Sequence, residues 1–323
     1  MKAVVVYKKG ELPKYGEFAD PIIQNENEVL ISVKAVAITN LDKGIVSGDH
    51  YSSGHENQNG IVIGSDAIGF LENGTRVYAR GLSGTIAEKA IVEKSRMVPL
   101  PEGISDEIAA SMPNAVAGSA MALRFRAKIQ SGETVLINGA TGFTGQMAIQ
   151  IAKHYGAKKI IVTGRNEKTL QSLLELGADE IISLKHEDEA IIAQLKVIQQ
   201  NTPIDIILDY LWGHSAELIF SFLKGKGNFT HPVRYVSIGA ISGDSIQLSA
   251  AILRSVDLQL SGSGLGSWTK DEVKLLFLEI LPEMFLLAAQ NKLKVNIETI
   301  PLADIEKMWN AEVPDGKRLV VMV

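Results

Sequence analysis

The most informative absence in this chain of 323 residues is cysteine, which does not occur at all. Without a thiol, the chain forms no disulfide and offers no thiolate nucleophile. It also cannot build the thiolate-based zinc and iron–sulfur sites on which many enzymes depend. Any function that needs cysteine is therefore excluded.

Long apolar runs and an excess of basic charge are also missing. The formal net charge is −5 and the pI is about 5.8, so the chain has no positive field to attract nucleic acid or an anionic membrane. No stretch approaches the ~18 consecutive apolar residues of a membrane span, and the start MKAVVVYKKG has too few apolar residues for a signal peptide. We therefore expect a soluble, cytoplasmic protein that has neither nucleic acid nor a membrane as its main partner.

What the chain does contain is enough apolar material for about two domains, with 46% hydrophobic and 21% charged residues. Residues 1 to about 110 are rich in short β-like runs, separated by Gly, Asn and Asp turns. From about residue 130, strand-like runs alternate with helical stretches, and a long apolar helix at about 272–291 precedes a last strand-like run, RLVVMV.

This pattern predicts an α/β protein with two domains. Alternation of strands and helices indicates βαβ units, so we predict a Rossmann-type, doubly wound parallel sheet over residues 116–264. Because both ends of the chain are β-rich, residues 1–115 and 265–323 are expected to form one mostly antiparallel β domain.

One loop carries the dinucleotide-binding fingerprint. The run Thr134–Asn138 leads into GATGFTG and then into an amphipathic helix, with alanine in the first glycine position. The second glycine lets the backbone approach a pyrophosphate, the third lets the helix pack closely on the strand, and the helix N-terminus attracts the anion. The residues predicted to bind here are Ala140, Thr141, Gly142, Phe143, Thr144 and Gly145.

The end of the next strand predicts which dinucleotide binds. An NAD site needs an acidic residue there to hold the ribose 2′-hydroxyl, but the run KKIIVT ends at Gly164, Arg165 and Asn166, with Lys168 just after. Gly164 leaves room for a 2′-phosphate, Arg165 can grip it with a forked contact, and Lys168 can add a point charge. We therefore predict NADP(H) as the cofactor, with solvated turn residues as the alternative interpretation.

The sequence resembles the medium-chain dehydrogenase/reductase superfamily over essentially its whole length. Besides the loop, the resemblance rests on SDAIGF followed by GTRVYA, on MVPLPEGISDEIAASMPNA, on VSIGAISG and on LQLSGSGLGS. It implies a GroES-like catalytic domain formed by both chain ends and an NADP-binding Rossmann domain between them. Further cofactor contacts are implied at Asn114, Ile238, Gly239, Ser263, Gly264 and Leu265, with Ser119 and Arg318 as weaker candidates.

Within the superfamily, the chain looks like the zinc-free quinone oxidoreductases. The positions at which zinc-dependent relatives carry their metal ligands fall at Thr39, Ser65 and Asp66, so no metal is implied. The triplet Gly54-His55-Glu56 spells the Gly-His-Glu of the zinc enzymes, but it runs into the turn NQNG instead of a strand. We interpret it as a polar loop.

A metal-free relative suits a substrate that already accepts hydride readily. Quinones and α,β-unsaturated carbonyls qualify, because conjugation spreads the incoming charge onto an oxygen. The resemblance places Asn40 and Asp42 beside the nicotinamide ribose and the loop 47–53 over the substrate. Relatives usually carry tyrosines in this region; here His50 or Tyr51 lies near one such position, and either of them, or solvent, could donate the proton.

Assembly and function have open alternatives. The run SVDLQLSGSG alternates apolar residues at Val256, Leu258 and Leu260, as on an edge strand, and relatives pair such an edge across a dyad, so we expect a homodimer. Two other functions stay open. One is a metal-dependent alcohol dehydrogenase that uses residues 49–56, and the other is a non-catalytic, NADPH-binding sensor or structural protein.

Overall fold

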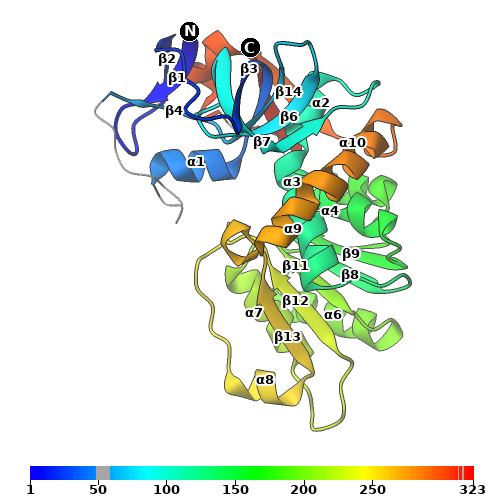
Figure 1. Ribbon diagram of the computed structural model, residues 1–323. Helices are drawn as coiled ribbons and strands as arrows, with labels where there is room; N and C mark the ends of the chain where they lie inside the picture. The colour runs from blue at the N-terminus through cyan, green and yellow to red at the C-terminus, as the bar shows by residue number, and fades with distance from the viewer. Residues whose placement is uncertain (49–58, 312, 315) are drawn as a thin grey trace. The chain divides into compact units, whose positions relative to one another are not determined.

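The computed structural model describes residues 1–48, 59–311, 313–314 and 316–323 (Figure 1). The chain divides into two compact units. Unit 1 consists of Met1–Asn114 and Phe277–Val323, and unit 2 consists of Ala115–Leu276. The two ends of the chain therefore belong to one unit, and the segment between them forms the other.

Unit 1 is built mainly from antiparallel strands. These are β1 Lys2–Val6, β2 Lys14–Glu17, β3 Glu28–Ile38, β4 Ile61–Val62, β5 Asp66–Phe70, β6 Arg76–Gly81, β7 Lys89–Pro99, β14 Asn296–Pro301 and β15 Lys317–Met322. The larger sheet has the order β14-β15-β3-β5-β6-β7, and β7 also pairs with β3, so four strands close into a ring. The antiparallel pairing of β15 with β3 is where the two chain ends meet.

The helices of unit 1 are short. They are α1 Asn40–Ser47, α2 Asp106–Ser111, α10 Leu281–Ala289 and α11 Ile305–Met308, with α3 Pro113–Met121 leading into unit 2. Alternate side chains of the strands, among them Ile31, Val33 and Val77, point inward to a core that includes Leu319 and Val321 of the last strand. The small sheet β2-β1-β4 lies outside the ring in the strand order.

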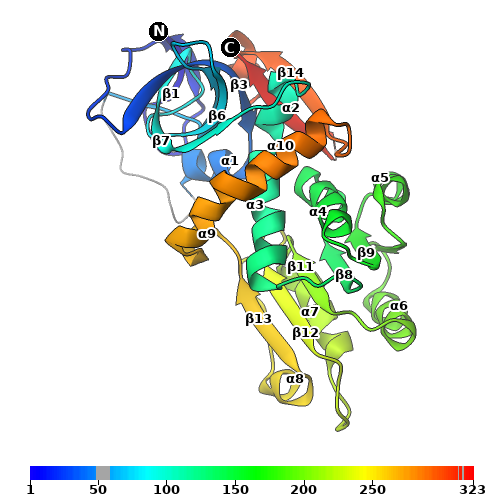
Figure 2. The same cartoon turned by 45° about the vertical axis from the view of Figure 1, so that its right-hand side comes forward.

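Unit 2 contains one sheet of six parallel strands in the order β10-β9-β8-β11-β12-β13 (Figure 2). The strands are β8 Thr134–Asn138, β9 Lys159–Gly164, β10 Glu180–Ser183, β11 Ile206–Asp209, β12 Val233–Ser237 and β13 Leu258–Gly262. The chain starts in the middle, winds outward to β10, and then crosses to β11 and winds the other way. This is the doubly wound order, and its reversal between β8 and β11 creates a crevice at the carboxyl edge of the sheet.

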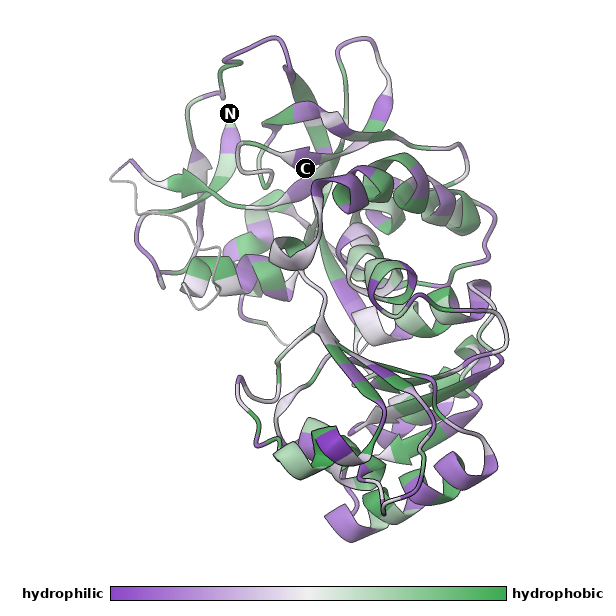
Figure 3. Cartoon of the chain, turned by 60° about the horizontal axis from the view of Figure 1, so that its bottom comes forward, coloured by the Kyte–Doolittle hydropathy of each residue, from purple (hydrophilic) through white to green (hydrophobic). Residues whose placement is uncertain are grey.

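Helices cover both faces of this sheet, as its central strands require, because these strands are buried throughout. The helices are α4 Phe143–His154, α5 Glu167–Ser172, α6 Asp188–Asn201, α7 Gly213–Leu223, α8 Ala250–Ser255 and α9 Lys270–Leu275. Apolar residues of α6 and α7 pack on Leu136, Ile161 and Ile207, and the alternate residues of the same strands face the other side. Figure 3 colours each residue by its hydropathy, with hydrophobic residues in green on strands and helices alike.

The predicted long apolar helix near the C-terminal end is divided. A π-helical turn, Leu276–Ile280, separates α9 from α10, and Pro282 lies at the start of α10. Proline has no amide hydrogen to donate, so the regular ladder of helical hydrogen bonds is interrupted there. A second π-helical turn, Ala122–Arg126, follows α3. Among the described residues, no helix has the length and hydropathy needed to cross a bilayer.

Candidate functional site

The fingerprint segment forms a turn between β8 and α4. Gly139 follows β8 with φ +91°, a left-handed conformation that favours glycine, and its amide donates to Thr163 Oγ1 at 3.1 Å. Gly142 is the N-cap residue of α4; it is exposed and has no side chain with which to cap the helix. The positive end of the helix dipole therefore faces outward at this point, where a diphosphate can bind.

The two fingerprint glycines are needed for different reasons. A Cβ at Gly145 would lie 2.5 Å from Cα of Ala140, so α4 packs on the end of β8 only because this side chain is missing. A Cβ at Gly142 would meet no atom within 4 Å, which leaves the backbone open to a ligand. Of the other predicted residues, Ala140 and Phe143 are buried, and Thr141 and Thr144 are half-buried.

The second strand of the sheet ends beside this loop. A Cβ at Gly164 would lie 2.4 Å from Thr141 Cγ2, so the end of β9 touches the phosphate loop. Arg165, Asn166 and Lys168 follow and are all exposed. The side-chain oxygen of Asn166 caps α5 by accepting a backbone amide at 3.0 Å. Arg165 and Lys168 are thus exposed cationic groups that follow the strand end touching the loop.

A buried polar network, which sequence reasoning missed, joins the strand ends beneath the loop. Asn138 at the end of β8 donates Nδ2 to Asp209 Oδ1 at 2.7 Å, and its Oδ1 accepts from Thr163 Oγ1 of β9 at 2.6 Å. Asp209 ends β11 and accepts from the Tyr235 hydroxyl of β12 at 2.6 Å. All four side chains are essentially inaccessible. The available signal was a polar residue closing each of the apolar runs TVLIN and IILD.

The electrostatics of this network keep it fixed. Burial and the adjacent carboxylate of Asp209 raise the pKa of Tyr235 well above its usual value, so the tyrosine remains a hydrogen-bond donor. Asp209 also accepts the backbone amides of Leu211 and Trp212 at distances between 2.9 and 3.2 Å. Hydrogen bonds to a buried carboxylate are charge-assisted and therefore strong.

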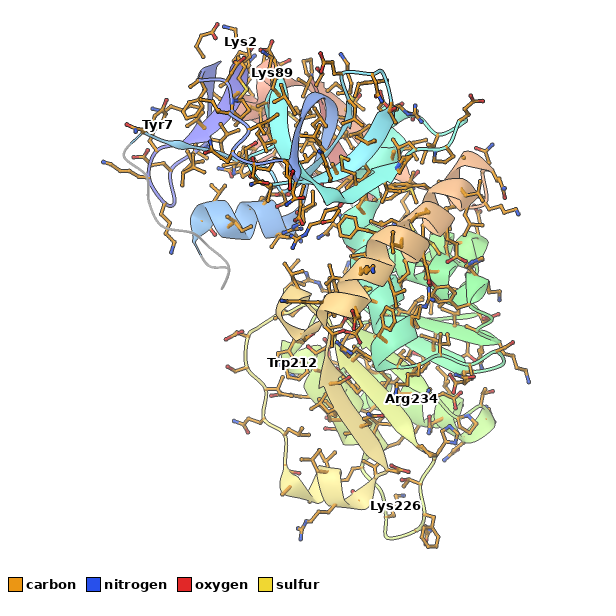
Figure 4. All side chains as sticks on the ribbon, viewed as in Figure 1. Lys2, Tyr7, Lys89, Trp212, Lys226 and Arg234 are labelled. Atoms are coloured by element: carbon orange, nitrogen blue, oxygen red, sulfur yellow. The ribbon has the colours of Figure 1, made fainter. Side chains whose placement is uncertain are left out.

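These bonds hold a strained turn. Trp212, labelled in Figure 4, lies between β11 and α7 and has φ +56° and ψ −152°, a region that residues other than glycine rarely occupy. Its ring packs edge-on against Phe220 and Tyr235. Ring packing and the hydrogen bonds to the Asp209 carboxylate thus hold Trp212 in its strained conformation. The turn lies at the end of β11, next to the point where the strand order reverses.

The remaining predicted cofactor residues of unit 2 directly follow β12 or β13. They are Ile238, Gly239, Ser263, Gly264 and Leu265. The amides of Ile238 and Gly239 donate to the backbone oxygen of Asp209 at 2.8 and 3.2 Å. Ser263 is buried, Gly264 is half-buried and Leu265 is exposed. The structure therefore brings the fingerprint loop, the end of β9 and these residues to one edge of the sheet.

Two candidates on α3 have different surroundings. Asn114 is half-buried. Ser119 is completely buried, and its hydroxyl lies 2.8 Å from the hydroxyl of Tyr210. Burial raises the pKa of Tyr210 above its ordinary value, so this pair stays neutral. The Ser119 hydroxyl is therefore hydrogen-bonded to another side chain of unit 2.

In unit 1, Asn40 and Asp42 occupy different environments. Asn40 begins α1 and is exposed, whereas Asp42 is only 4% exposed. The Asp42 carboxylate accepts the amide and hydroxyl of Thr39 at 2.9 and 2.5 Å, and the hydroxyl of Ser65 at 2.8 Å. Thr39 and Asp42 form a capping box that fixes the start of α1. Of the pair, only Asn40 is open to solvent.

The positions aligned with zinc ligands in relatives form a hydrogen-bonded group here. Thr39 and Ser65 both donate to Asp42, and Asp66 accepts from the Tyr78 hydroxyl at 3.0 Å. In the part of the chain that the structure describes, no group of three or more His, Asp or Glu is placed to hold a metal. The predicted residues His50 and Tyr51, and the His55-Glu56 pair, lie outside the described residues.

Arg318 belongs to the interior of unit 1. It lies in β15, is 8% exposed, and its Nη1 donates to the backbone oxygen of Ile38 at 3.5 Å. Burial lowers its pKa to about 10, while the carboxylates of Asp42 and Asp66 act in the opposite direction. Arg318, a weaker cofactor candidate in the sequence, is therefore a buried residue of β15 whose charge lies near the carboxylates of Asp42 and Asp66.

Known proteins resemble this chain over most of its length. The family profile for zinc-binding dehydrogenases matches residues 144–280. The quinone oxidoreductase of Sus scrofa is 28% identical over 282 residues, which are 84% of this chain and 82% of that protein. Two solved quinone oxidoreductases align over 100% of both chains: that of Thermus thermophilus, 25% identical with a TM-score of 0.79, and that of Escherichia coli, 24% identical with a TM-score of 0.83.

These likenesses confirm the predicted α/β fold, with its parallel Rossmann-type sheet and its second, mostly antiparallel domain. Together with the sequence relatives, they support a medium-chain dehydrogenase/reductase of the quinone-oxidoreductase-like kind. The zinc-binding dehydrogenase profile does not reach Thr39, Ser65 or Asp66, so its match concerns the nucleotide-binding part of the fold and not those positions.

Asp66 makes the stability of unit 1 depend on pH. Burial, with a smaller effect of Asp42, raises the pKa of Asp66 from 3.8 to about 6, against opposing effects of Arg80, Tyr78 and Arg318. Between about pH 4 and pH 6 the folded protein holds a proton that the unfolded chain has lost, so stability falls as the pH rises through this window. Asp66→Asn, which can still accept from Tyr78, should raise the free energy of unfolding at pH 7.5 by about 2 kcal/mol.

Urea denaturation at several pH values checks this prediction. The advantage of Asp66→Asn over the native protein should shrink steadily as the pH falls from 7.5 to 4, and it should vanish only below pH 3.8, where the native side chain becomes neutral in the unfolded chain as well. Asp244→Asn, in an exposed loop, is the matched control and should show no such trend. A stability difference for Asp66→Asn that stays constant from pH 4 to 7.5 would contradict the argument.

Proposed function

We propose that the protein is an NADPH-dependent oxidoreductase that transfers hydride to a quinone or an α,β-unsaturated carbonyl without using a metal. The observation that carries the proposal is the contact between Gly164 and the phosphate loop at Thr141, followed at once by Arg165. A cation, and no carboxylate, stands at the end of the second strand, where the adenosine ribose binds in this fold. The Thermus and Escherichia coli quinone oxidoreductases were solved as complexes with NADPH, which supports the same cofactor here.

The residues of unit 2 fit this cofactor. The open backbone at Gly142 and the N-terminus of α4 suit the diphosphate, and Arg165 with Lys168 suits the 2′-phosphate. Residues 238–239 and 263–265 would line the nicotinamide half at the ends of β12 and β13. When bound, NADPH supplies the hydride, and the task of the protein is to orient the ring and exclude water.

Substrate choice follows from what the chain lacks. With no cysteine in the sequence, and threonine, serine and aspartate at the positions of the metal ligands, the substrate should need no Lewis acid. A quinone or enone delocalises the incoming charge onto an oxygen, where one hydrogen-bond donor and one proton complete the reduction. Within this proposal, Asn40 is an exposed polar residue at the start of α1, and His50, Tyr51 or solvent supplies the proton. Asp42 holds α1 in place.

Activity with a panel of acceptors tests the proposal directly. The purified protein should oxidise NADPH, followed by its absorbance, in the presence of benzoquinones, naphthoquinones or short enones, and it should do so equally well after treatment with a chelator. Turnover of simple alcohols that chelation abolishes would favour a metal-dependent alcohol dehydrogenase. Binding of NADPH with no turnover of any acceptor would favour a sensor or structural role.

Cofactor preference should depend on Arg165. Replacing Arg165 by Asp removes a charge-assisted contact to the 2′-phosphate and adds a repulsive charge, so NADPH binding should weaken by at least about 1.5–3 kcal/mol, while NADH binding changes little. Calorimetric titration with both nucleotides measures the difference. Lys196→Asp makes the same change of charge on the exposed face of α6 and should leave both affinities unchanged. Equal losses for the two nucleotides in Arg165→Asp would remove the NADP assignment.

The predicted homodimer also remains a proposal, supported by the position of β13. In the described part of the chain, this strand pairs only with β12 and is an edge of the sheet. Leu258 is half-buried and Leu260 is 38% exposed, whereas Val256 is already buried before the strand begins. An exposed apolar edge strand is suited to pairing with a second copy across a dyad.

Sedimentation velocity tests this assembly. The native protein should sediment as a dimer, and Leu260→Asp should shift it toward the monomer, because a carboxylate would have to lose its water at the paired edge. Leu253→Asp, at an exposed position on α8, is the control and should remain dimeric. A native protein that sediments as a monomer at micromolar concentration would rule the dimer out.

A further inference from the structure

The second half of the parallel sheet carries a braced turn at its carboxyl edge. In a doubly wound sheet, each half takes one mononucleotide, and the phosphate loop and Arg165 belong to the half made by β8, β9 and β10. The half made by β11, β12 and β13 is therefore left for the nicotinamide. Residues Ser263–Ser267 turn directly after β13. A role of this turn toward the nicotinamide rests on the proposed function.

The turn is held together from inside by short polar contacts. The hydroxyl of Ser267 accepts the amide of Gly264 at 3.0 Å and donates to its carbonyl oxygen at 2.9 Å. Trp268 Nε1 donates to the hydroxyl of Ser263 at 3.0 Å. The amide of Ser263 donates to the backbone oxygen of Ser237 at 2.8 Å, which ties the turn to β12. These contacts set the shape of the turn, but they do not anchor its far end.

The far end is anchored by Arg126. Its guanidinium group donates from Nη1 to Glu272 Oε1 at 3.0 Å and from Nη2 to Glu272 Oε2 at 2.9 Å, and Nη2 also donates to the backbone oxygen of Ser267 at 2.6 Å. The same carboxylate accepts the amide of Thr269 at 2.8 Å in the capping box of α9. Both charged side chains are 17% exposed. Two parallel bonds between planar groups fix orientation as well as distance.

The position of Arg126 explains why it reaches the turn. It ends the π-helical turn Ala122–Arg126, in which each turn is wider than in an α-helix, so the side chain is directed differently from one in a regular helix. The hydrogen bond from Arg126 lowers the pKa of Glu272, which keeps the pair ionised at neutral pH. Arg126 and Glu272, which are 146 positions apart in sequence, thus form an ion pair that fixes the end of the turn.

The geometry points to Arg126 and Glu272 as positioning residues. By fixing the backbone of Ser267, they hold the 263–267 turn in the shape that receives the nicotinamide half of the cofactor. They do not contact the cofactor themselves. Their removal should therefore weaken binding of the nicotinamide half and disturb hydride transfer, while the adenosine half binds as before.

Two ligands separate the two halves. Adenosine 2′,5′-bisphosphate reports only on the phosphate loop and Arg165, and NADPH reports on the whole site. In Arg126→Ala the dissociation constant for NADPH should rise about tenfold, and kcat with a quinone should fall by a similar factor, while the constant for the bisphosphate stays within about twofold. Arg126→Lys keeps the charge but loses the forked hydrogen bonds, so it should show a smaller change of the same kind. It serves as the test if the alanine variant does not fold.

The chain offers a matched control at the opposite edge of the sheet. Arg234 at the start of β12, labelled in Figure 4, pairs with Glu133 and donates to the backbone oxygen of Ala127 at 2.6 Å, with similar exposure. Arg234→Ala removes a comparable pair away from the carboxyl edge. It should lower the melting temperature and leave the ratio of the two dissociation constants unchanged. Exchanging the charges, Arg126→Glu with Glu272→Arg, should recover part of the NADPH affinity that Arg126→Glu alone loses.

The outcomes distinguish the two levels of the proposal. If Arg126→Ala and Arg126→Lys leave the ratio of the NADPH and bisphosphate constants unchanged, or if Arg234→Ala alters it equally, the pair is a structural brace only. In that case the inference is overturned, and the proposed function stands. If the native protein binds neither ligand, the proposed function fails, and this inference fails with it.

Discussion

A single buried negative charge organises the nucleotide-binding edge of this protein. The Asp209 carboxylate accepts from the Asn138 amide, the Tyr235 hydroxyl and the amides of Leu211 and Trp212. An ion in a completely buried position is stable only if donors replace its lost water. The strands that supply these donors are therefore fixed relative to one another, and so is the strained turn between β11 and α7.

At this edge of the sheet, the buried residues near the charge support the loops, and other, exposed residues are available for binding. Asn138, Thr163 and Ser119 are buried and satisfied by other side chains, so they set the positions of the loops. Gly142 and Arg165 are exposed on those loops and remain available to a ligand. Unit 1 repeats the arrangement, because the buried Asp42 fixes the helix on which the exposed Asn40 lies. Preorganised support of this kind is what a site needs to orient a cofactor.

Sequence reasoning found the features that depend on local pattern. The phosphate loop and the alternation of strands and helices are written in neighbouring residues, and the structure places Gly142 and Gly145 as that pattern requires. It missed the Asp209 network, because β8 and β11 become neighbours only through the crossover of the chain. It also did not foresee the burial of Arg318, because an arginine is rarely buried and only the pairing of β15 with β3 places it beside two carboxylates.

The pairing of β15 with β3 has a consequence for synthesis on the ribosome. Unit 2 is one continuous segment, 115–276, and can begin to fold as soon as it has emerged. The four strands of the ring in unit 1 are made early, but the larger sheet is complete only when β15 pairs with β3, with Leu319 opposite Ile38, after residues up to Met322 have been made. Until then, residues 35–38 of β3 remain an unpaired edge, the kind of surface on which nascent chains associate wrongly. Chaperones that shield exposed strands would thus act on the first hundred residues of this protein more than on its nucleotide-binding half.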